Sequence, residues 1–491
     1  MTRRTLALTA ALLAFGPGVA RAQEVLVEAD ASQHPPDSAT RKVHGDVRFG
    51  VGFGFITEDP IASLAPSFGL DLRDVAPVQF RLGAPINLRI YDRTPEQGPV
   101  IRKTEWDEAG DYLAILQQLS FNGDYIFGTY GRATVDVRVG GLQRVHAGHG
   151  TIVHGFANSL DVDRRRTGLD ALARVEGDLL DQPAGSEVQL VVSDLAGQQI
   201  FGTRLGADWA GAGVGFSVFG DPFAPRALNL SPVGGLEIDK RNQLVGTGRG
   251  VAVVGFDISY SWSDRWRYLV VPYFDMNFIP GLGRGMHLGV DTEFRLGRRR
   301  AFRLGVLAEL TVGSQHYDPT FFDVFYGTQR MQAQFAARHL DVGAPFYADA
   351  TPKYGFVLQN DLHGAGAYGG LRLAHDEGFF FETGYRYRPG PLGHTWENRL
   401  GLDLEVVQMS LLLAHKGGFG FNIAEPSPNG TLARLDLAVP VHRFIDVTVQ
   451  GGWQPVMRRA VNETAAHGVP SAGFYGAGAL FLFGAAGHFD W

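Results

Sequence analysis

The stretch from 254 to 278 reads VGFDISYSWSDRWRYLVVPYFDMNF, and it decides the fold. Apolar side chains occupy every second position from Val254 to Trp262, and glycine, serine or aspartate fills the positions between them. A turn signal follows at 263–265, and the alternation then resumes as far as Phe278. Because successive side chains of a strand point to opposite faces, the stretch predicts a β-hairpin with one apolar face.

The same alternation recurs along the chain in segments of about ten residues separated by turn signals, which is typical of transmembrane β-strands. The polar positions mix glycine with charges of both signs. A soluble β-sandwich also alternates, but its outer face is solvated and rich in Lys, Ser and Thr. The mixed face favours a barrel with a polar lumen, and a soluble β-protein is the alternative. Further segments of this kind lie at 47–55, 132–139, 287–295, 302–310, 379–388, 399–406 and 434–439.

The predicted fold is all-β: one transmembrane antiparallel up-and-down β-barrel over 46–491, with about 18 strands and roughly 16 to 20 compatible. Connection lengths fall into two classes, as expected for short periplasmic turns and long extracellular loops. Assigning them to alternate sides requires one extra strand from about Gln329 to His339. The short turns lie near Ser263, 298–300, 376–378 and 442–443, and the long loops near 58–77, 92–110, 223–249, 416–430 and 454–473.

The final strand carries aromatic residues in alternation, at Phe481, Phe483, Phe489 and Trp491. It resembles the C-terminal β-signal of bacterial outer-membrane barrel proteins, although a terminal Trp replaces the more usual Phe. The resemblance covers this strand alone. It implies that the barrel-insertion machinery of the outer membrane recognises the chain, and that the protein is a porin-like outer-membrane barrel.

The N-terminus predicts export. Arg3 and Arg4 precede an apolar stretch from Leu6 to about Phe15, and a small-residue cleavage site ends at Ala22. This order is typical of a cleaved signal peptide over 1–22. A short periplasmic segment, 23–45, follows and is too short for the plug domain of an active receptor. No later apolar run reaches the length of a helical membrane span.

Composition agrees with a β-rich exported chain. The 65 Gly, 34 Phe and 15 Tyr accompany only 19% charged residues. The net charge of -7 excludes a basic surface for nucleic acid, so we predict no nucleic-acid partner. No cysteine is present, so disulfides and thiolate metal sites are impossible. We predict no cofactor.

The alternation along the predicted strands assigns two sets of residues, an aromatic girdle and a charged lumen lining. Trp262, Trp266 and Tyr268 gather at the tip of the 254–278 hairpin and predict part of an interfacial aromatic girdle. Acids and bases are about equally represented on the polar face, which predicts weak ion selectivity. The predicted lumen-lining residues are Arg81, Arg89, Arg132, Asp136, Arg138, Asp257, Asp291, Glu293, Arg295, Glu309, Arg386, Arg388, Asp403, Glu405, Arg434 and Asp436.

The densest polar cluster lies at 143–168, and its glycine-flanked turn and arginine-rich part are similar to features of porin-like and polysaccharide-export barrels. His146, His149 and His154 belong to it, and imidazole is a common metal ligand. In a strand, however, His146 and His149 would point to opposite faces. We therefore predict no metal site.

An enzyme is the weaker interpretation. The segment 315–318, Gln-His-Tyr-Asp, offers a histidine, but no serine stands in a motif with it. We predict a non-enzymatic porin-like channel for small polar solutes or oligosaccharides. The alternative is a non-transporting anchor of an envelope-spanning secretion, adhesion or motility complex. Expected partners are outer-membrane lipid, lipopolysaccharide and the insertion machinery, with periplasmic or envelope-complex proteins in the anchor case.

Overall fold

The computed structural model describes most of the chain from Val43 to Asp490. The predicted signal peptide and nearly all of the segment 23–45 lie outside the described residues. No helix in the described part is long and apolar enough to cross a membrane. The described residues are 43–56, 59–73, 75–91, 106, 109–127, 131–160, 166–197, 199–229, 236–237, 244–248, 250–264, 267–297, 301–331, 333, 351–376, 378–404, 406–416, 430–460 and 472–490.

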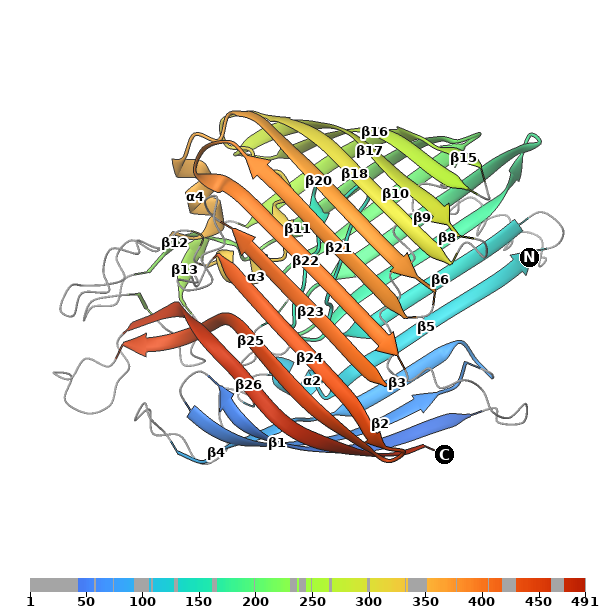
Figure 1. Cartoon of the computed structure of the whole chain (residues 1–491). Helices are drawn as coiled ribbons and strands as arrows, with labels where there is room; N and C mark the ends of the chain where they lie inside the picture. Colours follow the sequence, from blue (N-terminus) through green and yellow to red (C-terminus); the bar gives the residue numbers. More distant parts are fainter. Residues whose placement is uncertain are drawn as a thin grey trace, which may run out of the picture.

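The wall is a closed antiparallel barrel in which neighbours along the chain pair with each other (Figure 1). The wall strands are β1 (His44–Ile56), β2 (Asp59–Asp71), β3 (Val78–Gly83), β4 (Ile86–Arg89), β5 (Leu116–Phe127), β6 (Gly131–Gly140), β8 (Gly168–Leu179), β9 (Gln182–Val192), β10 (Phe201–Trp209), β11 (Ala212–Asp221), β14 (Val251–Tyr260), β15 (Trp262–Asp264), β16 (Tyr268–Ile279), β17 (Gly283–Leu296), β18 (Phe302–Gly313), β20 (Gly364–His375), β21 (Phe379–Arg388), β22 (Gly393–Leu404), β23 (Val407–Lys416), β24 (Thr431–His442), β25 (Ile445–Ala460) and β26 (Ala472–Asp490). The first strand pairs with the last, from Asp46↔Asp490 to Ile56↔Leu480, and this pairing closes the ring.

The wall has twenty spans, because two spans are each made of two strands. β3 and β4 both pair with β2 in one continuous register, and Pro85 lies between them. β14 and β15 share one register against β16, with Pro272 opposite the gap. Proline cannot donate a ladder hydrogen bond, so it interrupts the pairing. The all-β barrel prediction is confirmed, and the count lies at the upper end of the predicted range.

Alternation along the strands separates an apolar outside from a polar inside. In β17, Leu288 is 60% exposed on the outer face, whereas the adjacent His287 is fully buried on the inner face. The exposed aromatic residues of β1, such as Phe53, follow the same phase. An apolar band around a closed sheet is what a hydrocarbon surrounding requires, because lipid offers no hydrogen-bond partners.

The two ends of the barrel differ in their connections. At the end near the C-terminus every connection has two to six residues, from Leu180-Asp181 to 72–77. At the opposite end six connections are much longer, namely 90–115, 141–167, 222–250, 314–363, 417–430 and 461–471. The short turns mark the periplasmic end. The prediction of one long loop over 58–77 is wrong, because β2 occupies most of it.

A second prediction, the extra wall strand from about Gln329 to His339 within the 314–363 connection, is wrong. β18 and β20 pair directly over twelve residues each, so no wall strand lies between them. The start of the predicted strand at Gln329 belongs to a helix, and 334–339 lies outside the described residues. Alternation of Met331, Ala333 and Phe335 with polar residues therefore did not mark a membrane strand. The remaining elements are α2 (Ala109–Leu113), β7 (Val153–His154), β12 (Pro225–Leu228), β13 (Gly246–Gly248), β19 (Phe322–Asp323), α3 (Tyr326–Gln329), α4 (Lys353–Gln359) and the 3₁₀ helix η4 (Gly390–Leu392).

Val290 provides a test of the outer face, because it lies near the middle of β17. Replacing Val290 by Arg should lower the free energy of unfolding by about 2–4 kcal/mol, the usual cost of a lipid-facing arginine at the bilayer midplane. The matched control is Val406→Arg, in the turn between β22 and β23, where the expected cost is about 0–1 kcal/mol. Urea titration in lipid bilayers measures both, and equal losses would contradict the assigned membrane band.

Candidate functional site: a lumen crossed by two loops

The described residues of two long connections fold back into the barrel, and we call 141–160 with 166–167 the first lumen loop and 314–331, 333 and 351–363 the second lumen loop. They are bonded to each other, because β7 and β19 pair in parallel. The backbone N–H of Phe322 donates to the carbonyl of Ile152 over 3.1 Å. Side chains of both loops form one apolar cluster with the inner wall, including Phe156, Phe321 and Phe219. The core of the protein is thus inside the barrel.

The second lumen loop is anchored to two separate parts of the wall. Arg388, the last residue of β21, donates to Asp318 at 3.0 Å and to Asp323 at 3.1 Å. Lys353 of α4 lies 3.1 Å from Asp318. These four side chains are almost completely buried, so their charges must neutralise one another.

The second anchor of this loop is Asp221 at the end of β11. Arg330 donates to its carboxylate at 2.5 Å, and the Tyr326 hydroxyl donates to it at 2.9 Å. β11 and β21 are separated by several spans in the ring. The second lumen loop therefore spans the interior between them.

The first lumen loop is attached by side chains of the wall that reach its backbone. Arg399 of β22 donates to the carbonyls of Gln143 at 3.0 Å and Gly155 at 3.1 Å. Arg144 pairs with Glu382 of β21. On another part of the wall His149 bonds Asp275 of β16 at 2.9 Å. These contacts hold the loop across the barrel.

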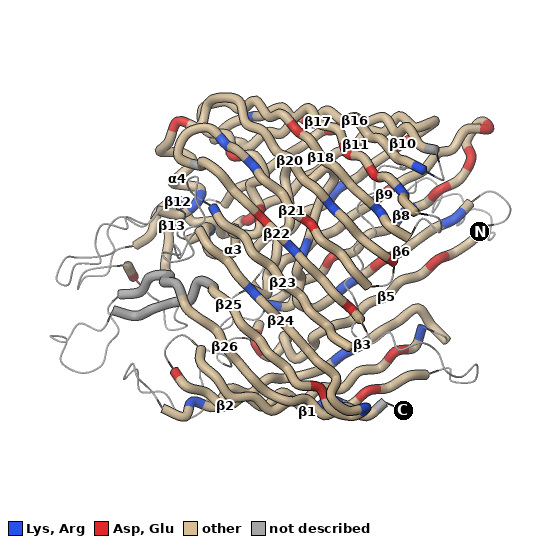
Figure 2. Tube along the Cα trace, viewed as in Figure 1, with Lys and Arg blue, Asp and Glu red and all other residues tan. Residues whose placement is uncertain are grey.

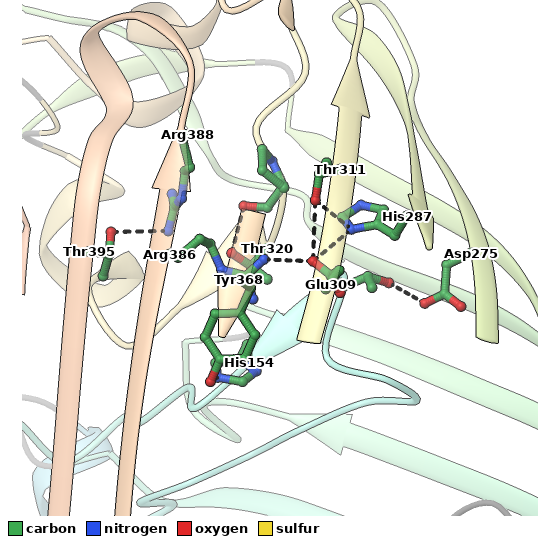
Figure 3. A network of polar contacts seen from close by, with 12 residues as sticks. His154, Asp275, His287, Glu309, Thr311, Thr320, Tyr368, Arg386, Arg388 and Thr395 are labelled. Carbon is green, nitrogen blue, oxygen red and sulfur yellow. Dashed lines mark hydrogen bonds and ion pairs between the residues drawn. The ribbon is translucent and has the colours of Figure 1, made fainter. Parts of the chain in front are cut away.

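Glu309 of β18 binds side chains of neighbouring wall strands and, through His287, supports the second lumen loop (Figure 3). Its carboxylate accepts from Tyr273 at 2.8 Å and from Arg386 at 3.0 Å, and it bonds Nδ1 of His287 at 3.0 Å. Nε2 of His287 contacts the hydroxyl of Tyr317, in the second lumen loop, at 2.6 Å. A buried carboxylate with three partners is a rigid attachment point for the loop.

The inner wall divides into two sectors by exposure. In the filled sector, β8 to β23, the loops cover many of the inward charges, and Arg388 and His287 are at most 1% exposed. Arg295, near the periplasmic end of β17, is an exception with 45% of its side chain exposed. In the wet sector, β24 to β26 and β1 to β6, Arg138 keeps 51% and Arg434 keeps 37% of the side-chain surface exposed. Figure 2 shows charges of both signs along the strands of the barrel. The inward arginines Arg138 and Arg434 are therefore more exposed than the covered charges of the filled sector.

The predicted lumen residues have oppositely charged partners at most positions that the structure describes. In the wet sector these pairs are Arg81–Asp46, Arg89–Asp59, Arg132–Asp124, Arg138–Asp136 and Arg434–Asp436. In the filled sector they are Asp257–Arg204, Asp291–Arg372, Glu293–Arg295, Glu309–Arg386 and Arg388–Asp318. Asp403 is partly buried in β22, and Glu405 lies outside the described residues. That these residues line a conducting lumen stays a prediction.

Of the predicted girdle, Trp262 and Tyr268 are exposed at the periplasmic end, and Trp266 lies outside the described residues. Of the predicted insertion signal, Phe481, Phe483 and Phe489 are exposed on the outer face of β26. Trp491 lies outside the described residues. Recognition by the insertion machinery stays a prediction.

The histidine cluster is arranged differently from the strand that the sequence suggested. His146 and His154 lie with ring centroids 4.7 Å apart, and His149 stacks on Tyr273 at 4.0 Å. Among the described residues, His149, Asp257 and Asp275 bring ligand atoms within 4.8 Å of one another. Arg204 holds both oxygens of Asp257, however, and this cationic partner disfavours a cation there.

The segment 315–318 serves as attachment. Nδ1 of His316 contacts the backbone carbonyls of Val357 and Asn360 at 3.1 and 3.0 Å. Tyr317 and Asp318 have the wall partners described above. The polar atoms of this segment thus bind the loop to itself and to the wall.

Sequence reasoning included the anchors Glu309, Arg386 and Arg388 among the predicted lumen residues and left out others. His287 and Arg399, which contact the loops, and Arg204 and Arg372, which pair with other wall residues, occupy polar positions of wall strands, so the alternation could have found them. Asp318, Asp323 and Lys353 belong to an irregular loop without a period. Only the folded chain brings them to Arg388.

The closed antiparallel ring, its exposed apolar band and its polar interior define the chain as a bacterial outer-membrane β-barrel. No family model matches the chain, and a search of curated proteins gives no match. The chain is similar to the solved structure of OpdK from Pseudomonas aeruginosa with vanillate, at 10% identity over 91% of this chain and 98% of that one, with a TM-score of 0.32.

Two further similar structures are the siderophore receptor PirA from Acinetobacter baumannii and a mutant porin from Rh. blastica. The first has 10% identity over 92% of this chain and 81% of that one, with a TM-score of 0.36. The second has 8% identity over 91% and 99%, with a TM-score of 0.26. The class assigned here rests on the strand pairing and the apolar band of this chain.

Arg388 allows a test of the buried anchor. Arg388→Ala leaves two buried carboxylates with fewer cations, so the free energy of unfolding should fall by about 3–5 kcal/mol. The matched control, Arg132→Ala, removes one partner of an exposed pair and should cost about 0–1 kcal/mol. Urea titration compares them, and an equal effect of the two substitutions would argue against the anchor.

Asp323 gives the anchor a pH dependence. Burial alone would raise the pKa of Asp323, but Lys353, Lys416 and Arg388 together hold the pKa well below its ordinary 3.8. The ionised Asp323 carboxylate therefore contributes its full stabilisation of the folded state above pH 3.8, and this contribution decreases as the pH falls below that value. The excess stability of the wild type over Asp323→Asn should be present at about pH 7 and smaller at about pH 3. The same excess at both pH values would refute this linkage.

Proposed function

We propose that the protein is a porin-like channel in which small polar solutes diffuse along the wet sector. The observation that carries the proposal is the difference in exposure between the inward charges of the two sectors. Charged side chains that face inward and remain hydrated are typical of a water-filled passage. The filled sector then narrows the passage and fixes its shape.

Beside the proposed passage, the inner face of β1 and β26 carries glycine at neighbouring positions. Gly50 and Gly52 of β1 and Gly484 of β26 share the inward phase, so few side chains extend into the lumen there. The charged positions of the wet sector are paired acid to base. Balanced charge predicts weak selectivity between cations and anions.

One observation supports a second candidate function, that of a non-transporting envelope anchor. Two loops cross the barrel and bond to each other, which is what a non-transporting envelope anchor would also have. In that case periplasmic or envelope-complex proteins would be its partners. Conductance separates the candidates.

The first experiment is single-channel conductance of the refolded protein in a planar bilayer, after heat-modifiable gel mobility has shown insertion. We expect steady openings and a reversal potential close to zero in a salt gradient, because the charges balance. Strong anion preference would contradict the charge assignment. A folded but silent barrel would favour the anchor.

The absence of native cysteine permits a sharper test of the passage. Arg434→Cys places a thiol on the inner face of the wet sector, and a bulky thiol reagent should lower its conductance markedly. Leu435→Cys is the matched control, because the adjacent residue points to the outer face. An unchanged conductance of labelled Arg434→Cys would overturn a path along this wall.

A further inference from the structure

Three arginines lie next to one another at the periplasmic mouth of the barrel, in neighbouring parts of the wall. Arg295 of β17 is directly opposite Arg303 of β18. On its other side, the backbone N–H of Arg295 donates to the carbonyl of Arg267, the residue before β16, over 2.9 Å. We call these three residues the arginine row. Because like charges at opposed positions of a sheet repel, the row costs stability unless anions neutralise it.

Nearby carboxylates neutralise the arginine row only in part. The guanidinium of Arg295 lies 3.4 Å from the carboxylate of Glu293. The guanidinium of Arg303 lies 2.9 Å from the carboxylate of Asp376. Arg267 is exposed and makes no ion pair within the part of the chain that the structure describes. Since 45% of the Arg295 side chain is also exposed, the row is accessible to a further anionic partner.

The sequence concentrates arginine at this part of the periplasmic end. Connection 265–267 has two arginines and connection 297–301 has three, whereas no other short connection at this end has more than one. The whole chain, in contrast, has a net charge of -7. The proposed contact is confined to the arginine row, and the other arginines add positive charge to this end. Such a local excess attracts an anionic partner.

The arginine row is on the lumen side of the wall. Phe294 and Leu296, on either side of Arg295 in the chain, are exposed on the outer face, and so is Phe302, next to Arg303. Because side chains alternate between the two faces of a strand, Arg295 and Arg303 point inward. An acidic chain in the mouth of the barrel reaches them more directly than a lipid headgroup outside the barrel does.

The segment that precedes β1 has the complementary charge. The part from 23 to 40 has four acids and no Lys or Arg. It leads into β1, whose first residue, His44, is at the periplasmic end of the wall. The acids of this segment are Glu24, Glu28, Asp30 and Asp37.

The segment is long enough to reach the arginine row. β1 and β17 are on opposite sides of the ring of twenty spans. With strands about 4.8 Å apart and tilted by about 40°, such a ring is about 40 Å wide. The residues from 23 to 42 can extend over at most about 66–72 Å. A contact with the row therefore takes the segment across the mouth.

We propose that the acidic segment 23–40 docks on the arginine row and lies across the periplasmic mouth of the barrel. Exposed ion pairs are individually weak and are screened by salt, so docking needs several pairs at once and is lost at high ionic strength. The inference goes beyond the proposed channel, because this contact within the chain does not require conduction.

Engineered thiols test the contact, because the chain has no native cysteine. Ala31→Cys places one thiol among the acids of the segment, and Ala374→Cys, directly opposite Arg303 in β20, places the other beside the row. The protein from residue 23 onward is refolded in phosphatidylcholine vesicles and treated with an oxidant. The disulfide should form about 10-fold faster in about 0.1 M salt than in about 1 M salt, because salt screens the docked charges.

The matched control combines Ala31→Cys with Ala438→Cys. Ala438 is an inward-facing alanine near the periplasmic end of β24, and only β25 and β26 separate that strand from β1. Chain length alone therefore favours cross-linking to Ala438→Cys. Faster cross-linking to Ala374→Cys in low salt supports docking, and equal or slower cross-linking there overturns it.

Exchange of charge distinguishes docking from a purely structural role of the arginines. Arg295→Glu together with Arg303→Glu should remove the preference for Ala374→Cys. Adding Glu28→Lys and Asp30→Lys to the same chain should restore the preference, and failure to restore it would contradict the pairing of charges.

Two controls accompany the exchange. Arg132→Glu changes an exposed inward arginine at the periplasmic end of β6 and should leave the preference unchanged. A preference that disappears when phosphatidylglycerol is added to the vesicles would assign the arginines to anionic lipid and overturn the proposal. Heat-modifiable mobility of each variant shows that it is folded before oxidation.

Conductance of the same samples distinguishes this inference from the proposed function. A silent barrel that shows the cross-linking preference retains the docked segment and loses the channel. A conducting barrel without the preference retains the channel and loses the docked segment.

Discussion

Every backbone N–H and C=O group in the hydrocarbon region needs a partner within the protein, and this constraint determines the rest of the structure. The pairing of β1 with β26 removes the last free sheet edge. Glycine permits the close approach of the two backbones there. A Cβ on Gly54 would lie 1.7 Å from the carbonyl oxygen of Phe481, and one on Gly484 would lie 2.2 Å from that of Val51.

Closure of twenty spans creates a wide polar interior, and the protein fills part of it with its own chain. The two lumen loops supply an apolar cluster, and the wall supplies charged anchors at Asp221, Glu309, Arg388 and Arg399. Buried ions are tolerated only with close partners, which explains why these anchors are ion pairs or multiply hydrogen-bonded groups. The described parts of the two loops are thus attached to the wall at several points.

The same arrangement separates two tasks within one lumen. The filled sector is packed with side chains of the two loops, and it holds a small cavity lined in part by His146, His149 and His154. The wet sector keeps hydrated charges of both signs beside a wall of small residues. In the channel that we propose, the loops would form one side of the passage and the wet sector the other.

Period-two alternation was sufficient to predict the barrel and its apolar outer face, because one side of each strand meets lipid and the other does not. Strand phase could not show that Arg388 is buried while Arg434 is hydrated, because both occupy equivalent polar positions. The interior loops have no period, and their contacts join residues far apart in the chain, such as Asp221 with Arg330. Sequence alone therefore determined a membrane barrel with a charged interior. Only the tertiary structure decided which part of that interior is filled, since loop residues find their partners through the closed ring.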